Sequence, residues 1–446
     1  MKKILILAYD FPPYVSVGGL RPCSWHKYLK EFGVEPIVVT RQWGNEYGNH
    51  LDYIAPSESN HVIIEHTEYG RIIRAPYFPT RSNRMLLERG NDYLPRVRKM
   101  LTAYHELGQF PFPIGPKREL YKAAQEFLKN EKVDAIIATG EPFVLFKYAA
   151  QLSKQYIIPW IADYRDPWSQ NEGRVKNGLV KKVNVANEKK WLASVDYICT
   201  VSPFIKAKIE ELLPEKQIAI LENGYDPEIV NDVSSIRQNS DYLSIAFVGS
   251  IYHWHPLDLF LRSAKEFIDQ HKEVKMKFKF YGTNKNEFIK KQVEQEYPSL
   301  KAHIELFPKL SNEELLRKLR EDHVMLIFND YSIMGTKIYD YLGIRRKMIL
   351  CFSEDPEALE LKRRYYIIDE SSAFSKTMQE DLIKSTQSGI VVKDSKNLIE
   401  VFNELYAEFQ DKREIACNSV GVEQFSRKVQ VEKLAELVKR IAQAHF

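Results

Sequence analysis

Cysteine is scarce in this chain, and long apolar runs are missing. The 446 residues include only four cysteines, which stand far apart and form no CxxC pair: Cys23, Cys199, Cys351 and Cys417. Such spacing indicates neither a zinc site nor a disulfide framework, and it fits a reducing cytoplasm. No run of about 18 apolar residues occurs, so the sequence predicts no membrane-spanning helix. We expect a cytoplasmic protein.

Two common nucleotide-binding motifs are absent as well. Neither GxGxxG nor GxxxxGK[ST] occurs anywhere, which counts against dinucleotide-dependent oxidoreductases and P-loop NTPases. The net charge of +4 is small for this length. No concentrated basic module marks a nucleic-acid binder. The sequence therefore argues against these three classes of protein.

What the chain does contain is an alternation of strands and helices that runs through it twice. Residues 3–8 form an apolar strand followed by a glycine-containing turn, and residues 243–250 repeat this opening. Strands alternating with helices are typical of doubly wound parallel sheets. The chain is also too long for one ordinary core. We predict an α/β protein of two Rossmann-like domains that face each other across a cleft.

The predicted domain boundaries follow turns and polar stretches. Residues 1–228 form the N-terminal domain, and the polar segment 228–241 links it to a second domain over 242–420. The last segment, 421–446, carries an amphipathic helix that we expect to pack at the domain junction. Further strands of the second domain are predicted at 275–281, 303–307, 324–328, 347–352, 365–368 and 389–392.

One stretch joins an apolar strand directly to a polar cluster. Residues 157–162 are mostly apolar, and Asp163, Arg165 and Asp166 follow. Ligands of open α/β sheets bind at the carboxyl ends of the strands, where this cluster falls. Charges near a core cost several kcal/mol unless they are paired (order of magnitude). The cluster is therefore either an acceptor or catalytic site, or a loop pinned by Arg165 paired with one of the two aspartates.

A glycine pair precedes the first predicted helix. Gly18 and Gly19 stand between the first strand and a helix that carries Trp25, Tyr28 and Leu29 on one face. Glycines at a helix start let backbone N–H groups approach an anion, and the helix dipole assists this binding. The pair also fits a simple turn, so this signal by itself is weak.

Residues 81–118 interrupt the alternating pattern. They hold eight Lys and Arg against three Asp and Glu, together with several aromatic residues and a proline-rich end. Basic and aromatic side chains together suit an anionic membrane surface or a lipid-linked phosphate. Arg96, Arg98 and Lys99 are the basic residues that we expect to matter most. The alternative is a solvated, partly helical insertion.

Five segments together resemble a known family. They are Pro12-Pro13 through Gly18-Gly19, Pro159 through Trp168, Asn223 through Asp226, Phe247 through Tyr252, and Gly335 through Leu342. In this order and spacing the chain resembles family 4 glycosyltransferases, which have the GT-B fold. It looks closest to the bacterial surface-polysaccharide branch. The resemblance extends from end to end, and Ala-Asp-Tyr-Arg-Asp-Pro-Trp is its most specific part.

The resemblance implies a retaining glycosyltransferase that requires neither a metal nor another cofactor. Its donor is a nucleotide-sugar, UDP- or GDP-linked, held mainly by the C-terminal domain. Lys337 is the candidate for neutralising the departing diphosphate, and Asp340, one helical turn further on, replaces the family's glutamate for the ribose hydroxyls. The other donor-binding residues that it implies are Gly18, Gly19, Gly249, Ser250, His253, Phe307, Gly335 and Thr336.

The acceptor is implied to bind the N-terminal domain. Asp166 is the candidate for orienting the acceptor hydroxyl or taking its proton, with Asp163 and Arg165 beside it. The family's Pro-Pro-His-Ser is replaced by Gly140-Glu141-Pro142-Phe143, so Glu141 either contacts the acceptor or caps the next helix. The acceptor is a lipid-linked or other saccharide, with membrane contact through 81–118. This places the protein at the inner face of the cell membrane.

A third departure keeps other functions open. The basic residue expected after Gly249-Ser250 is replaced by His253-Trp254-His255-Pro256, where a histidine could bind a phosphate or simply form a surface turn. The alternatives to transfer are a GT-B sugar-nucleotide epimerase and a degenerate scaffold that binds a glycan or a partner without catalysis. Product analysis and nucleotide-dependent thermal shifts would separate them.

Overall fold

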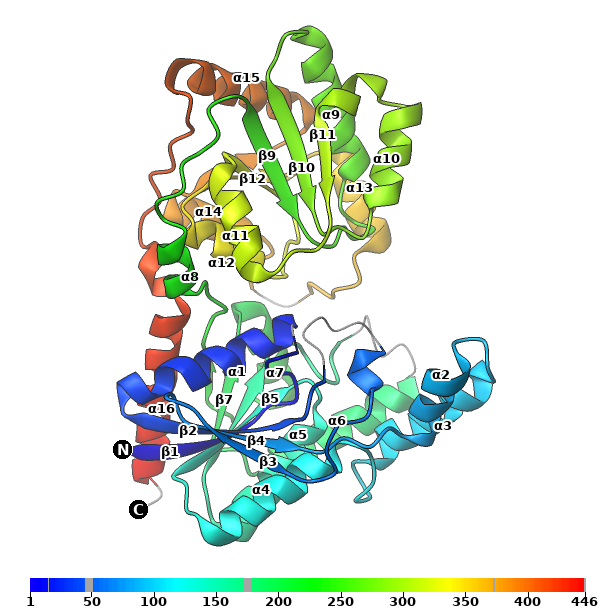
Figure 1. Cartoon of the computed structure of the whole chain (residues 1–446), viewed down its shortest axis with the longest axis vertical. Helices are drawn as coiled ribbons and strands as arrows, with labels where there is room; N and C mark the ends of the chain where they lie inside the picture. Colours follow the sequence, from blue (N-terminus) through cyan, green and yellow to red (C-terminus); the bar gives the residue numbers. More distant parts are fainter. Residues whose placement is uncertain (15, 45–50, 172–177, 372–373, 445–446) are drawn as a thin grey trace. The chain divides into compact units, whose positions relative to one another are not determined.

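The chain folds into two compact units. The computed structural model describes residues 1–14, 16–44, 51–171, 178–371 and 374–444. Unit 1 comprises Met1–Glu222 together with Arg427–Phe446, and unit 2 comprises Asn223–Ser426. Figure 1 shows both units coloured along the chain. The C-terminal helix α16 therefore belongs to the same unit as the N-terminal sheet.

Unit 1 is built on one eight-stranded sheet. The strand order is β3-β4-β2-β1-β5-β6-β7-β8, and all neighbours are parallel except β3 and β4. β1 lies at the centre, where Ile4 pairs with both Pro36 and Ala135. The strands are β1 Lys2–Leu7, β2 Val34–Arg41, β3 Ile63–His66, β4 Arg71–Ala75, β5 Ala135–Gly140, β6 Trp160–Tyr164, β7 Tyr197–Thr200 and β8 Ile218–Ile220.

Helices cover this sheet because their apolar faces need burial. α1 and α16 share one core with the sheet, in which Trp25 and Tyr28 of α1 pack with Leu434 and Val438 of α16. The helices are α1 Val17–Tyr28, α2 Arg81–Arg89, α3 Pro95–Gly108, α4 Arg118–Asn130, α5 Val144–Tyr156, α6 Gly178–Leu192, α7 Pro203–Leu212 and α16 Arg427–Ala444, with short 3-10 turns η1 Leu29–Phe32 and η2 Asp52–Ile54.

Unit 2 repeats the arrangement with six strands, all parallel. Their order is β11-β10-β9-β12-β13-β14. The order reverses at β9 and β12, which is the switch point where open α/β sheets bind ligands. The strands are β9 Leu243–Val248, β10 Met276–Tyr281, β11 Ile304–Phe307, β12 Val324–Phe328, β13 Lys347–Cys351 and β14 Gly389–Val392.

Helices cover both faces of the second sheet. α9 and α15 pack on one core, around Phe260, Phe267 and Phe402, and α11 and α12 pack on the other, around Leu316 and Tyr339. The helices are α8 Pro227–Asp232, α9 Leu257–Gln270, α10 Asn286–Gln295, α11 Asn312–Glu321, α12 Lys337–Gly343, α13 Pro356–Tyr365, α14 Met378–Thr386 and α15 Ser395–Lys412, with 3-10 turns η3 Pro298–Ala302 and η4 Val422–Phe425.

The predicted α/β class is confirmed, with two parallel-sheet Rossmann-like domains and a C-terminal helix. The strand predicted at 365–368 is wrong, because α13 runs to Tyr365 and the Tyr366 hydroxyl then bonds to the Asp330 carbonyl at 2.9 Å. β3 and β4 were not predicted. The segment read as a linker, 228–241, is partly helical, since α8 begins at Pro227.

The insertion at 81–118 contains a helical hairpin, α2 and α3, drawn in blue-cyan in Figure 1. The Ser82 hydroxyl holds the two helices together by donating to the Arg98 carbonyl at 3.0 Å. Phe110 stacks on Trp168 at 5.2 Å between ring centroids, which ties the end of the hairpin to the loop after β6. Within the described residues, no helix combines the length and apolar content that crossing a bilayer needs.

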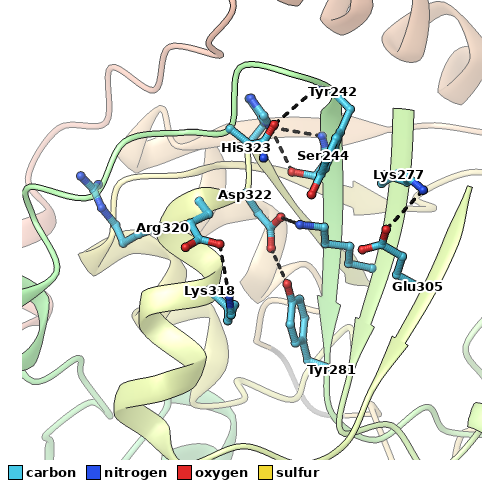
Figure 2. Close-up of polar contacts among 12 residues, drawn as sticks. Tyr242, Ser244, Lys277, Tyr281, Glu305, Lys318, Arg320, Asp322 and His323 are labelled. Atoms are coloured by element: carbon cyan, nitrogen blue, oxygen red, sulfur yellow. Dashed lines mark hydrogen bonds and ion pairs between the residues drawn. The ribbon is translucent and has the colours of Figure 1, made fainter. Parts of the chain in front are cut away.

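A buried polar cluster stabilises the start of β12 in unit 2. Asp322 is fully buried and accepts hydrogen bonds from Lys279 Nζ at 2.8 Å and from the Tyr281 hydroxyl at 2.9 Å. Figure 2 shows Asp322 between Tyr281 and the His323–Ser244 contact. Burial is the largest single influence on Lys279 and lowers its pKa, but the charge and hydrogen bond of Asp322, together with Tyr242, outweigh it, so the net pKa is raised. The pair is internal, and we treat it as structural.

Candidate functional site

The centre of the candidate site in unit 2 is Lys337 at the start of α12. Its ammonium group donates a 2.7 Å hydrogen bond to the Val248 carbonyl at the end of β9. A Cβ built on Gly249 would lie 1.4 Å from Lys337 Nζ and 2.8 Å from its Cε. Gly249 also has φ +90°, which favours glycine. The glycine therefore leaves the space that the lysine side chain fills.

The environment of Lys337 weakens its hold on a proton. Burial lowers its pKa from 10.5 to about 8, while the charges of Asp340 and Asp330 act in the opposite direction and Lys309 adds to the lowering. The group is still mostly protonated at pH 7. Binding an anion would stabilise a half-buried cation of this kind, because the attraction of a negative ligand would replace the hydration that burial removed.

Asp340 lies on the same helix as Lys337. α12 places it three residues on, about one turn, and only 8% of its surface is exposed. Its charge is the largest of those that favour protonated Lys337. The structure thus brings the predicted lysine and carboxylate together. What they bind remains a prediction.

A histidine and a tryptophan converge on Asp330, which follows β12. His255 Nε2 lies 2.7 Å from Asp330 Oδ1, and Trp254 Nε1 donates to the same oxygen at 2.9 Å. His255 Nδ1 accepts the Tyr252 N–H at 3.2 Å, which leaves Nε2 as the protonated nitrogen facing Asp330. Sequence reasoning missed Asp330, although it stands at a strand end as Asp163 does.

The other donor-binding residues predicted in unit 2 lie around Lys337 and Asp340 and differ in their exposure. His253 is exposed, with its ring 5.8 Å from that of Tyr365. It is His255 that points inward. Ser250 and Gly335 are exposed, and Thr336 is half-buried immediately before α12. Phe307, at the end of β11, stacks on Tyr281 at 4.6 Å between ring centroids.

In unit 1, Asp163 proves to be an interior residue. It is fully buried and accepts two hydrogen bonds from Arg21 Nε, at 3.0 and 3.2 Å, and one from Arg21 Nη2 at 2.8 Å. The Thr139 hydroxyl donates to it at 2.9 Å. Its partner is therefore Arg21 and not Arg165. We assign Asp163 a positioning role that fixes α1 against β6, and its predicted acceptor contact is untested.

Arg165 holds the loop that follows β5. Its Nε donates to the Gly140 carbonyl at 2.7 Å, and its Nη2 donates to the Glu141 carbonyl at 3.0 Å. A Cβ built on Gly18 would lie 2.2 Å from Arg165 Nη1. The structure thus brings together three predicted residues, Arg165, Glu141 and Gly18, at the carboxyl edge of the sheet.

Asp166 follows Arg165 and is exposed. The surrounding protein partly desolvates its carboxyl group, which raises the pKa of Asp166, and the neighbouring Arg165 charge offsets part of this rise. A carboxyl with a raised pKa at a strand end is suited to hydrogen-bond a hydroxyl. The position agrees with the predicted role, which no observation here tests.

One backbone amide of the glycine pair at the start of α1 is already hydrogen-bonded within the protein. The Gly19 N–H donates to the Ser16 hydroxyl at 3.0 Å and to the Ser16 carbonyl at 3.1 Å, as in an N-cap. Ser16 in turn donates to Asp10 Oδ2 at 2.8 Å. Asp10 was not predicted from the sequence. The signal was present, because Asp10 lies two residues after the predicted apolar strand 3–8.

Sequence comparisons identify no family: no family model matches the chain, and no curated protein matches it. Solved structures do match. A sucrose-phosphate synthase from Thermosynechococcus elongatus aligns over 100% of both chains, with a TM-score of 0.61 and 14% identity.

Two further solved structures are similar. An alpha,alpha-trehalose-phosphate synthase (UDP-forming) from Burkholderia xenovorans, in complex with glucose-6-phosphate, aligns over 98% of this chain and 100% of its own, with a TM-score of 0.58 and 12% identity. The catalytic domain of starch synthase IV from Arabidopsis thaliana, bound to ADP and acarbose, aligns over 100% and 99%, with a TM-score of 0.52 and 11% identity. At such identities the likeness establishes the fold, and the chain therefore has the GT-B fold of these glycosyltransferases.

Proposed function

We propose that this protein is a retaining, metal-independent glycosyltransferase of surface-polysaccharide biosynthesis, from the family 4 branch that its motifs resemble. It moves a sugar from a UDP- or GDP-linked donor to a saccharide acceptor carried on a lipid. The observation that supports this most is the half-buried Lys337 ammonium, held against the Val248 carbonyl where the first strand of unit 2 ends.

The chemistry of transfer explains why such a lysine is needed. When the glycosidic bond to the nucleotide breaks, negative charge develops on the leaving diphosphate. A preorganised cation in a site of low dielectric constant stabilises that charge more than water does. Asp340, one turn along α12, would accept hydrogen bonds from the two ribose hydroxyls. Both residues would act from one helix that the core of unit 2 holds in place.

The solved structures support a nucleotide-sugar donor. The trehalose-phosphate synthase is described as UDP-forming, and the starch synthase was bound to ADP. They also support a saccharide acceptor, because the trehalose-phosphate synthase was in complex with glucose-6-phosphate and the starch synthase was bound to acarbose as well as ADP. We assign the acceptor to unit 1, with Arg165, Glu141 and Asp166 beside it.

We further propose that the α2–α3 hairpin rests on an anionic membrane, from which the lipid-linked acceptor would be supplied. Four residues of α3 form an apolar stripe at helical spacing, and they are 44%, 73%, 60% and 37% exposed: Val97, Met100, Tyr104 and Leu107. Exposed Arg96 and Lys99 flank it. An exposed apolar stripe with basic flanks is the pattern of helices that lie in a membrane interface.

A nucleotide-binding screen tests the donor assignment. Calorimetry with UDP, GDP, ADP and CMP should show binding of at least one nucleotide to the wild type. The Lys337→Ala variant should lose most of that affinity, and its transfer rate should fall on the order of a hundredfold. Lys318→Ala, an exposed lysine paired with Glu321 on α11, is the matched control.

The possible outcomes separate the competing functions. Equal nucleotide affinity in the wild type and in Lys337→Ala would remove the role given to Lys337. No binding of any of the four nucleotides would favour a scaffold without catalysis. Release of an epimerised sugar nucleotide in the absence of acceptor would identify an epimerase.

A further inference from the structure

Besides Asp166, unit 1 has the Asp10 carboxylate at the carboxyl edge of its sheet. Only one of the two Asp10 oxygens has a hydrogen-bond partner among the described residues. Asp10 follows β1 and is half-buried. Its Oδ2 accepts the Ser16 hydroxyl at 2.8 Å. Its Oδ1 is buried and has no hydrogen-bond partner among the described residues. Leaving a charged acceptor in that state is costly, so a ligand that donates to Oδ1 would be stabilised.

Arg165 faces the same point from the end of β6. A Cβ built on Gly18 would lie 2.7 Å from Asp10 Oδ2 and 2.2 Å from Arg165 Nη1. Two other nitrogens of Arg165 are bonded to the carbonyls of Gly140 and Glu141. Nη1 donates to no other group in the part of the chain that the structure describes. Asp10, whose Oδ1 is an unused acceptor, and Nη1, an unused donor, therefore meet at the point beside Gly18.

This combination selects for a particular chemistry. Adjacent hydroxyls of a sugar can donate to a carboxylate through one group and accept from a guanidinium through the next. A phosphate, by contrast, would meet the negative charge of Asp10. The paired charges therefore favour a neutral polyol over an anion.

Aromatic rings near Asp10 also favour a polyol ligand such as a sugar. Tyr14, from the loop after β1, stacks on Trp43, from the end of β2, at 4.0 Å between ring centroids. Tyr14 is half-buried. Burial raises its pKa, and the nearby charge of Asp10 raises it further. Binding sites combine a few placed polar groups with aromatic surface in this way.

We propose that Asp10 and Arg165 form a saccharide subsite, in which Asp10 Oδ1 accepts a hydrogen bond from an acceptor hydroxyl and Arg165 Nη1 donates to the neighbouring oxygen. The inference rests on the proposed function, because it names the part of the acceptor that unit 1 would hold. The competing explanation is that Asp10 only fixes Ser16 at the start of α1. That role uses Oδ2 alone, and an asparagine would fill it equally well.

The test compares Asp10→Asn with Asp134→Asn. In the first variant the amide oxygen can still accept from Ser16, while an NH2 group replaces Oδ1 and reverses its hydrogen-bonding polarity. Asp134 is the control carboxylate, bonded at the opposite edge of the sheet to Lys2 Nζ at 2.9 Å and to the Lys3 N–H at 2.7 Å. The probes are the methyl glycosides of glucose, galactose, mannose and N-acetylglucosamine, observed by saturation-transfer NMR.

We expect at least one glycoside to bind the wild type and Asp134→Asn. Asp10→Asn should bind it at least about tenfold more weakly, as the loss of a charge-assisted hydrogen bond implies, with an unchanged unfolding temperature and unchanged nucleotide affinity. Equal binding by Asp10→Asn, or no glycoside binding to the wild type, would overturn the inference.

Two further measurements keep the outcome decisive. If Asp10→Asn does not fold, Gly18→Ala replaces it, because the added methyl group occupies the point between Asp10 and Arg165 and should abolish glycoside binding. Nucleotide binding by the wild type is measured in parallel. If it is present while glycoside binding is independent of Asp10, only this inference fails. If it is absent, the proposed function fails as well.

Discussion

The ammonium group of Lys337 occupies the space that a side chain at position 249 would need. The two residues lie on different elements, and the lysine reaches across to the Val248 carbonyl, 89 positions earlier in the chain. If this half-buried amine binds an anion, as proposed, the site requires both the lysine and the glycine. Four predictions follow from this contact and from the exposed hairpin of unit 1.

Replacing Gly249 by alanine should displace Lys337 and lower nucleotide affinity at least about tenfold, because the new Cβ would overlap Nζ. The positive φ of 90° adds backbone strain of about 1 kcal/mol. Gly90→Ala separates the two effects, since Gly90 has φ +80° and nothing within 4 Å of its Cβ position. Calorimetry that shows equal losses of affinity in both variants would contradict the displacement.

Nucleotide affinity should fall as the pH rises through about 8. Lys337 has its pKa lowered to about 8, so the protonated form that binds a diphosphate is lost above that pH, by up to about tenfold in affinity for each further pH unit. In Asp340→Asn the midpoint should move to lower pH, because the Asp340 charge favours protonated Lys337. Lys337→Arg, which stays charged, should flatten the profile. An unchanged slope in that variant would assign the titration to another group.

The free protein should gain stability when Lys337 is replaced by methionine. A pKa lowered from 10.5 to about 8 means that the folded state carries the cost of a buried charge at pH 7, at about 1.4 kcal/mol for each pKa unit. Loss of the bond to Val248 offsets about 1 kcal/mol. We expect a net gain of about 2 kcal/mol in the free energy of unfolding.

The pH dependence gives this stability prediction its sign. The folded pKa lies below the unfolded one, so the gain from Lys337→Met is complete below about pH 8 and disappears as the pH rises toward 10.5. Denaturant unfolding at pH 7 and pH 10 measures both values. A variant that is less stable than the wild type at pH 7 would show that the charged lysine does not destabilise the folded protein.

Membrane contact should require the apolar stripe of α3 as well as its charge. Met100→Glu should weaken binding to vesicles that contain about 30% anionic lipid, at low and at high salt, whereas replacing Arg96 and Lys99 by glutamine should weaken it mainly at low salt. Arg98 is left in place, because its Nε holds the Tyr93 carbonyl at 2.9 Å.

Phe288→Glu is the matched control for the vesicle experiment, since Phe288 is 41% exposed on α10 of unit 2. Co-sedimentation measures the bound fraction. If Met100→Glu and the control sediment like the wild type, the hairpin is not the membrane surface.

Local pattern was enough to predict the fold and where several candidate residues lie in it. Apolar strands that end in polar residues, followed by amphipathic helices, led to two Rossmann-like domains, and strand ends led to Arg165 and Asp166. Lys337 and Asp340 were predicted from a motif resemblance, and helical spacing placed them on one face. These placements agree with the structure because periodicity and chain direction alone decide which residues reach the carboxyl edge of a parallel sheet.

Tertiary structure decided what pattern could not. The sequence left the partner of Asp163 open, and packing of α1 against β6 made it Arg21. It assigned the donor contact to His253, whereas the turn before α9 points His255 at Asp330 and leaves His253 exposed. The overlap of Lys337 with the space at Gly249 has the same origin. Each of these contacts joins residues from different elements, so its geometry depends on how the elements pack and not on local spacing.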